Sequence, residues 1–246
     1  YEPLLPGIYW AEYANCYRCP FGKEKGTCNM ECVKQFEPIF QKLIAPECVA
    51  AIVVEPVQGE GGYVTPPKEF LQGLRTICDK YGIMLIFDEV QTGIGRTGEL
   101  YAYQTFGVKP DILTSAKALS GGIPLSAVIA RKELMEKWPA GAHGGTFGGN
   151  PLACSAALET LKIIEEDDLL THCKKMGAYF YDRLKELQQS YSSVIGDVRG
   201  VGLMIGMEII HEDGTPDGDL TSRIKQKALD KNVLLLTCGS DHNVVR

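Results

Sequence analysis

Apolar residues follow two kinds of pattern along this chain of 246 residues. Short continuous apolar runs predict buried strands at 50–54, 83–87, 112–113 and 127–130. Apolar residues at helical spacing predict helices at 33–44, 67–81, 132–138 and 151–165. Strands and helices that alternate in this way predict an α/β fold, with a parallel or mixed sheet that helices cover and right-handed crossovers between its parallel strands.

The pattern changes near residue 167, where a second group of elements begins. It predicts a long helix at 169–189, a glycine-rich strand at 196–210, a helix at 220–230 and a strand at 233–236. We therefore expect a large domain over residues 1–166 and part of a smaller α+β domain over 167–246.

Composition narrows the class of protein. The net charge of −6 and the pI near 5.3 leave no basic face for nucleic acid, and no apolar run approaches the length of a membrane span. Nine cysteines without a secretory signal are typical of a reduced, cytoplasmic protein. The chain begins at Tyr1 rather than at a methionine, so we expect it to be a piece of a longer protein, with any targeting segment outside it.

Charged residues follow three successive predicted strands. Glu55 follows the first, Asp88 follows the second and Lys117 lies just beyond the third. Ligands of open α/β sheets bind at the carboxyl ends of the strands, so we expect these side chains to share one crevice. A lysine that forms a Schiff base and an aspartate that pairs with a protonated pyridine nitrogen suit pyridoxal 5′-phosphate (PLP).

The same residues allow other interpretations. Asp88 could cap a turn or meet Arg96. Four apolar residues before Asp-Glu also resemble the metal-binding strand of P-loop nucleotide hydrolases, but the chain has no G-x-x-x-x-G-K-[ST] loop. Lys117 could be a solvated lysine, although its position between Ala116 and Ala118 favours a recessed amine.

Four motifs stand in the order and spacing of class III PLP-dependent aminotransferases. They are EPVQGEGG at 55–62, IFDEVQTGIGRTG at 86–98, SAK at 115–117 and GTFGGNP at 145–151. The chain most resembles 4-aminobutyrate aminotransferases, and the resemblance extends over nearly all of the chain after residue 40. It implies the fold-type I PLP architecture, in which the family's N-terminal third, with its phosphate-binding cup, has no counterpart in this chain.

The resemblance also implies roles for single residues. Lys117 would form the Schiff base with PLP and carry the substrate proton, and Asp88 would keep the pyridine nitrogen protonated. Val90 would pack against one face of the ring, and Gln91 would hydrogen-bond near its 3′-oxygen. Thr146 would contact the phosphate of the neighbouring subunit's cofactor, which makes a homodimer the smallest active unit.

Glu55 and Arg246 resemble the family's switch pair. The arginine would accept the α-carboxylate of glutamate or 2-oxoglutarate and would otherwise pair with the glutamate, although an ordinary interdomain ion pair is the simpler interpretation. The implied reaction is ping-pong transfer of an amino group from an ω-amino acid such as 4-aminobutyrate to 2-oxoglutarate. Ornithine, acetylornithine and diaminobutyrate aminotransfer are alternatives, and so is a truncated, non-catalytic module that dimerises.

Residues 1–32 lack any apolar period and are rich in proline, glycine and aromatic residues, which predicts loop or extended chain. Four of the nine cysteines lie in this segment, at Cys16, Cys19, Cys28 and Cys32. Four thiols could hold zinc or an iron–sulfur cluster, but the short central gap departs from usual zinc spacings, and a loop of inert thiols is the alternative. We therefore assign no metal ligand from the sequence.

Overall fold

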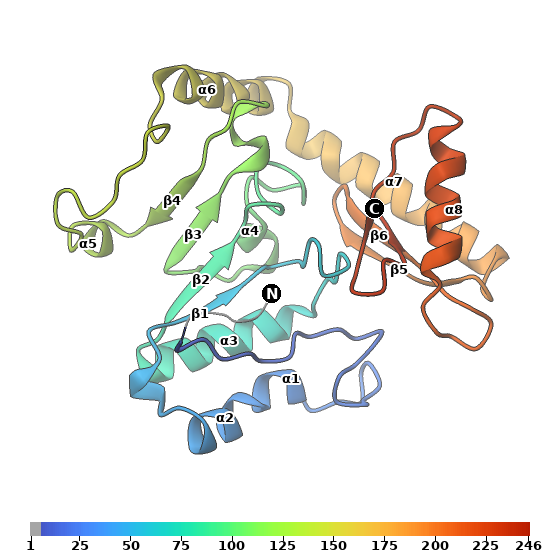
Figure 1. Cartoon of the computed structure of the whole chain (residues 1–246), viewed down its shortest axis with the longest axis horizontal. Helices are drawn as coiled ribbons and strands as arrows, with labels where there is room; N and C mark the ends of the chain where they lie inside the picture. Colours follow the sequence, from blue (N-terminus) through green and yellow to red (C-terminus); the bar gives the residue numbers. More distant parts are fainter. Residues whose placement is uncertain (1–5) are drawn as a thin grey trace.

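A four-stranded sheet forms the frame of the first part of the chain in the computed structural model, which describes residues 6–246 (Figure 1). Its strands are β1 (Ala51–Val54), β2 (Met84–Asp88), β3 (Ile112–Ser115) and β4 (Ala127–Ala130), in that order across the sheet. The first three are parallel and β4 is antiparallel to β3. The mixed sheet and all of its predicted strands are thus confirmed.

Helices and short 3₁₀ turns precede, connect and follow these strands. They are α1 (Glu31–Lys34), α2 (Phe36–Lys42), η1 (Pro46–Cys48), α3 (Lys68–Tyr81), α4 (Ala102–Phe106), η2 (Lys117–Ser120), α5 (Lys132–Met135) and α6 (Pro151–Glu166). The single helix predicted at 33–44 is wrong, since it is broken between Lys34 and Phe36. Pro38 explains the break, because its ring would clash with the carbonyl of Lys34 in a continuous helix. Across residues 6–246, no helix combines the length and apolar character that crossing a membrane requires.

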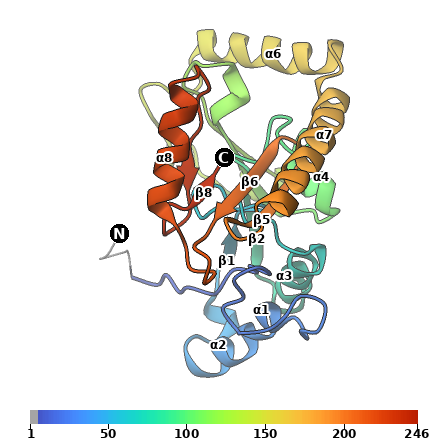
Figure 2. The ribbon, with the colours of Figure 1, turned by 90° about the vertical axis from the view of Figure 1, so that its right-hand side faces the viewer.

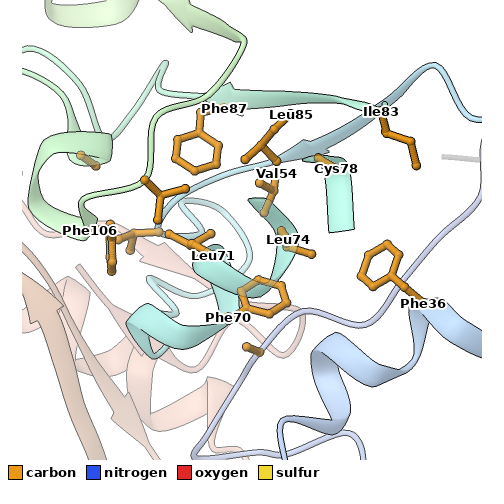
Figure 3. Packing of buried hydrophobic residues seen from close by; sticks show 14 of the residues in the cluster. Phe36, Val54, Phe70, Leu71, Leu74, Cys78, Ile83, Leu85, Phe87 and Phe106 are labelled. Carbon is orange, nitrogen blue, oxygen red and sulfur yellow. The ribbon is translucent and has the colours of Figure 1, made fainter. Parts of the chain in front are cut away.

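The core of this part lies between the sheet and α3 (Figure 3). Leu71 and Leu74 of α3 are fully buried against Leu85 and Phe87 of β2, whose side chains alternate across the strand and so share one face. Phe36 of α2 closes the same cluster from below in the view of Figure 3. The opposite face carries Asp88 and leaves apolar residues exposed, with Val53 at 67% exposure. Helices therefore cover one face of this sheet rather than both within residues 6–246.

A second sheet of four strands follows two further helices. The helices are α7 (Leu169–Ser190) and α8 (Gly218–Leu229), and the strands are β5 (Ile195–Val201), β6 (Met204–Ile209), β7 (Thr237–Cys238) and β8 (Val244–Val245). The strand order is β5-β6-β8-β7, and every pair is antiparallel.

Two predicted strands of this region are wrong. The single strand at 196–210 is a hairpin, because the chain turns at Gly202, whose φ of +57° suits glycine. The strand predicted at 233–236 lies later, at β7, where Thr237 and Cys238 pair with β8, while Leu234 is 79% exposed.

The second sheet has one apolar and one charged face. Val198, Ile205 and Ile209 form a cluster that α7 and α8 cover (Figure 2). Side chains alternate along the strands, so Arg199 and Glu208 point to the opposite face, toward the first part of the chain. A domain boundary at 166/167 would fall between α6 and α7, and it stays a prediction.

Replacement of Gly177 by alanine tests how closely α7 packs on the hairpin. A Cβ on Gly177 would lie 2.2 Å from the carbonyl oxygen of Gly202, so backbone must move. We expect Gly177→Ala to lower the free energy of unfolding by about 1–3 kcal/mol, as measured by urea denaturation. Gly144→Ala is the control because a Cβ there meets nothing within 4 Å. Equal stability of the two variants would contradict this packing.

Asp111 links several elements of the first sheet. It accepts hydrogen bonds from the backbone of Leu85 at 2.9 Å and from Arg75 at 2.8 Å, and Arg131 lies at 3.3 Å. Burial pushes the pKa of Asp111 up, but the hydrogen bonds from Leu85 and Arg75, together with the positive charges of Arg75 and Arg131, outweigh burial, so the pKa lies below its ordinary value.

Because the folded state lowers this pKa, Asp111 stabilises the fold above its unfolded pKa, and this contribution is lost as pH falls through the folded pKa. We expect Asp111→Asn to lower the free energy of unfolding by about 1–3 kcal/mol at neutral pH, with a difference that shrinks in acid. Urea titrations across acid pH measure this. Asp79→Asn is the control, since Asp79 also pairs with Arg75 but is 67% exposed. A difference that does not change with pH would contradict the role of the charge.

Candidate active site

The carboxyl ends of β1, β2 and β3 bring three charged side chains to one edge of the sheet. Asp88 ends β2, Glu55 follows β1 and Lys117 lies two residues after β3. Burial raises the pKa of Glu55, and the Asp88 carboxylate adds to that rise, while the Gly59 amide and the Lys117 amine oppose it. The three side chains therefore lie within electrostatic reach of one another, as expected from the sequence.

Asp88 is only partly buried and has one carboxylate oxygen to spare. Its Oδ1 accepts hydrogen bonds from the backbone of Val90 at 3.0 Å and from the Thr114 hydroxyl at 3.4 Å. Asp88 thus does cap the turn after β2, as one interpretation of the sequence expected. Its Oδ2 accepts no hydrogen bond from residues 6–246, so this oxygen remains able to meet a ligand.

Lys117 is exposed, so the expectation of a recessed amine is wrong. It begins η2 with a left-handed backbone, at φ +47°, and the small side chains of Ala116 and Ala118 cannot cover it. Two residues later, Leu119 is buried against Ala157 of α6. The turn that carries Lys117 is therefore anchored by Leu119.

Gln91 connects Lys117 to the second sheet. In the orientation that satisfies its amide, Gln91 Oε1 accepts hydrogen bonds from Lys117 Nζ at 3.3 Å and from Arg246 Nη1 at 2.9 Å. Gly59 lies against this amide, because a Cβ on Gly59 would be 1.7 Å from its other terminal atom, which is Nε2 in this orientation. A side chain at position 59 would displace the Gln91 amide, so the loop after β1 packs directly against Gln91.

Arg246 pairs with a different glutamate from the one expected. Its Nη2 lies 2.7 Å from Glu60 Oε1, and its guanidinium stands over the ring of Tyr63 at 5.5 Å from the centroid. Glu55 makes no ion pair with Arg246 within the described residues; its carboxylate accepts a hydrogen bond from the backbone amide of Gly59. The Glu55–Arg246 pair is therefore corrected to Glu60–Arg246.

Sequence reasoning missed Glu60 and Tyr63 as neighbours of Arg246. Glu60 lies within the motif at 55–62, and Tyr63 follows this motif directly. The motif was therefore the signal that could have identified both residues as part of the site. Spacing alone cannot tell which of its two carboxylates meets Arg246, because the arginine follows β8 of the other sheet.

Thr146 lies apart from this cluster, in the exposed stretch 141–150 between α5 and α6. Its neighbour Phe147 is 79% exposed. Contact of Thr146 with a second subunit stays a prediction.

The thiols of Cys16, Cys19, Cys28 and Cys32 line one small cavity, and none forms a disulfide. Burial raises the pKa of Cys32 to about 11, so this thiol keeps its proton at neutral pH. Within residues 6–246, no three side chains are placed to hold a metal ion. The observed arrangement is therefore one of free thiols.

Known proteins resemble this chain over its whole length. Residues 1–246 match the family model of class-III aminotransferases. A leucine/methionine racemase of Thermococcus litoralis is 46% identical over 87% of this chain and 48% of its own length. The 4-aminobutyrate aminotransferase GabT of Escherichia coli is 45% identical over 99% of this chain and 56% of its own. An amine transaminase from an uncultivated Pseudomonas species, in its PLP-bound form, has a TM-score of 0.91 at 34% identity, over 99% of this chain and 57% of its own.

The chain spans about half the length of the curated relatives it matches. The close structural match confirms the expected fold, that of fold-type I transferases. Identity well above 30% and a match over all residues confirm the resemblance drawn from the motifs. This chain belongs to the class-III aminotransferase family.

Proposed function

We propose that the chain carries the PLP site of an aminotransferase that moves an amino group from an ω-amino acid such as 4-aminobutyrate to 2-oxoglutarate by a ping-pong mechanism. One observation carries this proposal. Gln91 hydrogen-bonds both the Lys117 amine and the Arg246 guanidinium, at the sheet edge where Asp88 also lies. An amine for the cofactor and a guanidinium for a substrate carboxylate thus occupy one site.

The side chains present fit PLP. Lys117 offers an exposed amine for covalent attachment, and Asp88 offers the free Oδ2 to a protonated pyridine nitrogen. When bound, PLP supplies an electron sink for the carbanion formed at the substrate carbon. Lys117 Nζ would then carry the proton removed from the substrate carbon, and Gln91 would orient the Lys117 amine. Val90 would lie against the cofactor ring.

Arg246 is suited to bind the α-carboxylate of glutamate or 2-oxoglutarate. Its side chain is only 13% exposed, and its partner Glu60 is 70% exposed, so a substrate carboxylate can replace Glu60 beside Nη2 while Glu60 moves into solvent. Glu60 neutralises the guanidinium when a substrate lacks an α-carboxylate. The pair thereby accepts both kinds of substrate without leaving a partly buried charge unpaired.

A racemase is a second candidate, because the leucine/methionine racemase of Thermococcus litoralis is 46% identical to this chain. Racemisation removes a proton and returns it to the same carbon, so it needs no 2-oxo acid. Dependence of product formation on 2-oxoglutarate therefore separates the two activities.

We also propose a homodimer, in which the exposed loop carrying Thr146 would reach the phosphate of the neighbouring subunit's cofactor. A cytoplasmic location suits nine cysteines that are all free thiols.

Borohydride trapping tests the cofactor assignment. We expect PLP followed by reduction to leave one adduct, which peptide mapping places on Lys117, because reduction locks a Schiff base onto its amine. Lys117→Ala should lose the adduct, and Lys109→Ala, at an exposed lysine of the loop before β3, should keep it. An adduct that persists in Lys117→Ala would contradict the assignment.

Glu60→Gln tests the pairing with Arg246. Without the carboxylate, Arg246 stays unpaired when 4-aminobutyrate binds, so we expect kcat/KM for this donor to fall roughly tenfold. Glutamate brings its own α-carboxylate and should change by less than about threefold. Steady-state kinetics with both donors measure this, with Glu99→Gln, at an exposed ion pair with Lys174, as control. Equal losses of kcat/KM for 4-aminobutyrate and glutamate would contradict the proposed role of Glu60 as the alternative partner of Arg246.

A further inference from the structure

The charged face of the second sheet holds a group of side chains that the proposed reaction does not use. Glu208 of β6 is only 3% exposed and contacts two guanidinium groups, those of Arg18 and Arg199. Arg199 Nη1 lies 2.7 Å from Glu208 Oε2 and 3.0 Å from Asp197 Oδ2. Two carboxylates therefore hold one edge of the Arg199 guanidinium, which is itself 10% exposed.

The other edge of Arg199 faces a loop from the first part of the chain. Its Nε and Nη2 both donate to the carbonyl oxygen of Gly62, at 3.1 and 2.8 Å. In Figure 1 this loop, coloured cyan after β1, extends toward the second sheet. A forked guanidinium can meet this carbonyl and the carboxylates together, whereas a single ammonium cannot.

The loop over residues 59–63 carries the neighbours of Arg246. Glu60 forms the ion pair, and the ring of Tyr63 lies beneath the guanidinium. The backbone of Gly239 donates to the carbonyl of Glu60 at 2.9 Å, so the loop contacts this part of the chain at a second point besides Arg199. It also approaches β6 closely, since a Cβ on Gly206 would lie 2.9 Å from the Cβ of Tyr63.

The same loop touches the cofactor side of the site. Gly59 lies against the amide of Gln91, which contacts Lys117. Movement of this loop would therefore alter the surroundings of the amine and of the guanidinium at once.

We propose that Arg199 is a positioning residue for substrate binding. It acts through the Gly62 carbonyl, which keeps loop 59–63 against the second sheet, so that Glu60 and Tyr63 hold Arg246 in the orientation that accepts a carboxylate. This role rests on the proposed function of Arg246, but the contact with Gly62 does not.

Arg199→Lys tests the role because lysine keeps the charge but loses the fork. We expect the KM of the PLP-loaded protein for 2-oxoglutarate to rise roughly tenfold, with kcat within about threefold. A merely structural role would lower the fraction of active protein, and hence kcat, with KM unchanged. Arg183→Lys is the matched control, since Arg183 pairs with Glu186 on the exposed side of α7.

A double-mutant cycle shows whether the effect passes through the Arg246 pair. If Arg199 acts by holding Glu60, Arg199→Lys combined with Glu60→Gln should change KM by less than the product of the two single effects. Independent, multiplicative effects would overturn the proposal.

Hydrogen exchange gives a readout that needs no activity. Arg199→Lys should speed amide exchange in peptides covering residues 58–64 roughly tenfold, and Arg183→Lys should not. Asp197→Asn removes one of the two carboxylates that contact Arg199. We expect it to speed exchange and raise KM by smaller factors than Arg199→Lys does. This variant tests the proposal if Arg199→Lys does not fold.

The two proposals can fail separately. If Arg199→Lys speeds amide exchange but the protein shows no transamination, the contact between Arg199 and loop 59–63 is supported and the proposed function is contradicted. Transamination with unchanged exchange and unchanged KM would overturn the role of Arg199 alone.

Discussion

The parallel pairing of β1, β2 and β3 is the constraint on which the site depends. Parallel strands end at the same edge, so residues separated by dozens of positions come together without any long-range signal in the sequence. Asp88 pairs in register with Thr114, which also donates to its carboxylate, and Lys117 follows three residues later. Burial of Leu85 and Phe87 against α3 sets which face each strand turns inward, and so places Asp88 on the open face.

The second sheet completes the site from one side. Its apolar face is covered by α7 and α8, which leaves the other face free to carry buried charge. That charge is compensated, because Glu208 faces two guanidinium groups and one of them also binds a backbone carbonyl of the first part. Such a network is stable only when each member keeps its partners, which ties the position of loop 59–63 to the second sheet.

Local patterns predicted most of the fold. The four strands of the first sheet and the long helices α3, α6 and α7 lie where the apolar period placed them, since each buries one stripe or face. The errors have separate physical causes. Pro38 divides a helix that periodicity alone makes continuous, and Gly202 folds a run of alternating residues into a hairpin. For the site, the sequence predicted that Asp88 and Lys117 lie at the same edge of the sheet. It predicted Glu55 as the partner of Arg246, whereas the structure pairs Arg246 with Glu60.

By itself, the sequence determined the fold class, the family and the strand ends at which charged residues gather. These follow from local periodicity and from motifs that each lie within one short stretch of chain. Only the tertiary structure decided that Arg246 pairs with Glu60, that Gln91 joins Lys117 to Arg246 and that Arg199 holds Gly62. Each of these contacts joins residues from different parts of the fold, and their partners depend on how a loop after β1 lies against a sheet formed more than a hundred residues later.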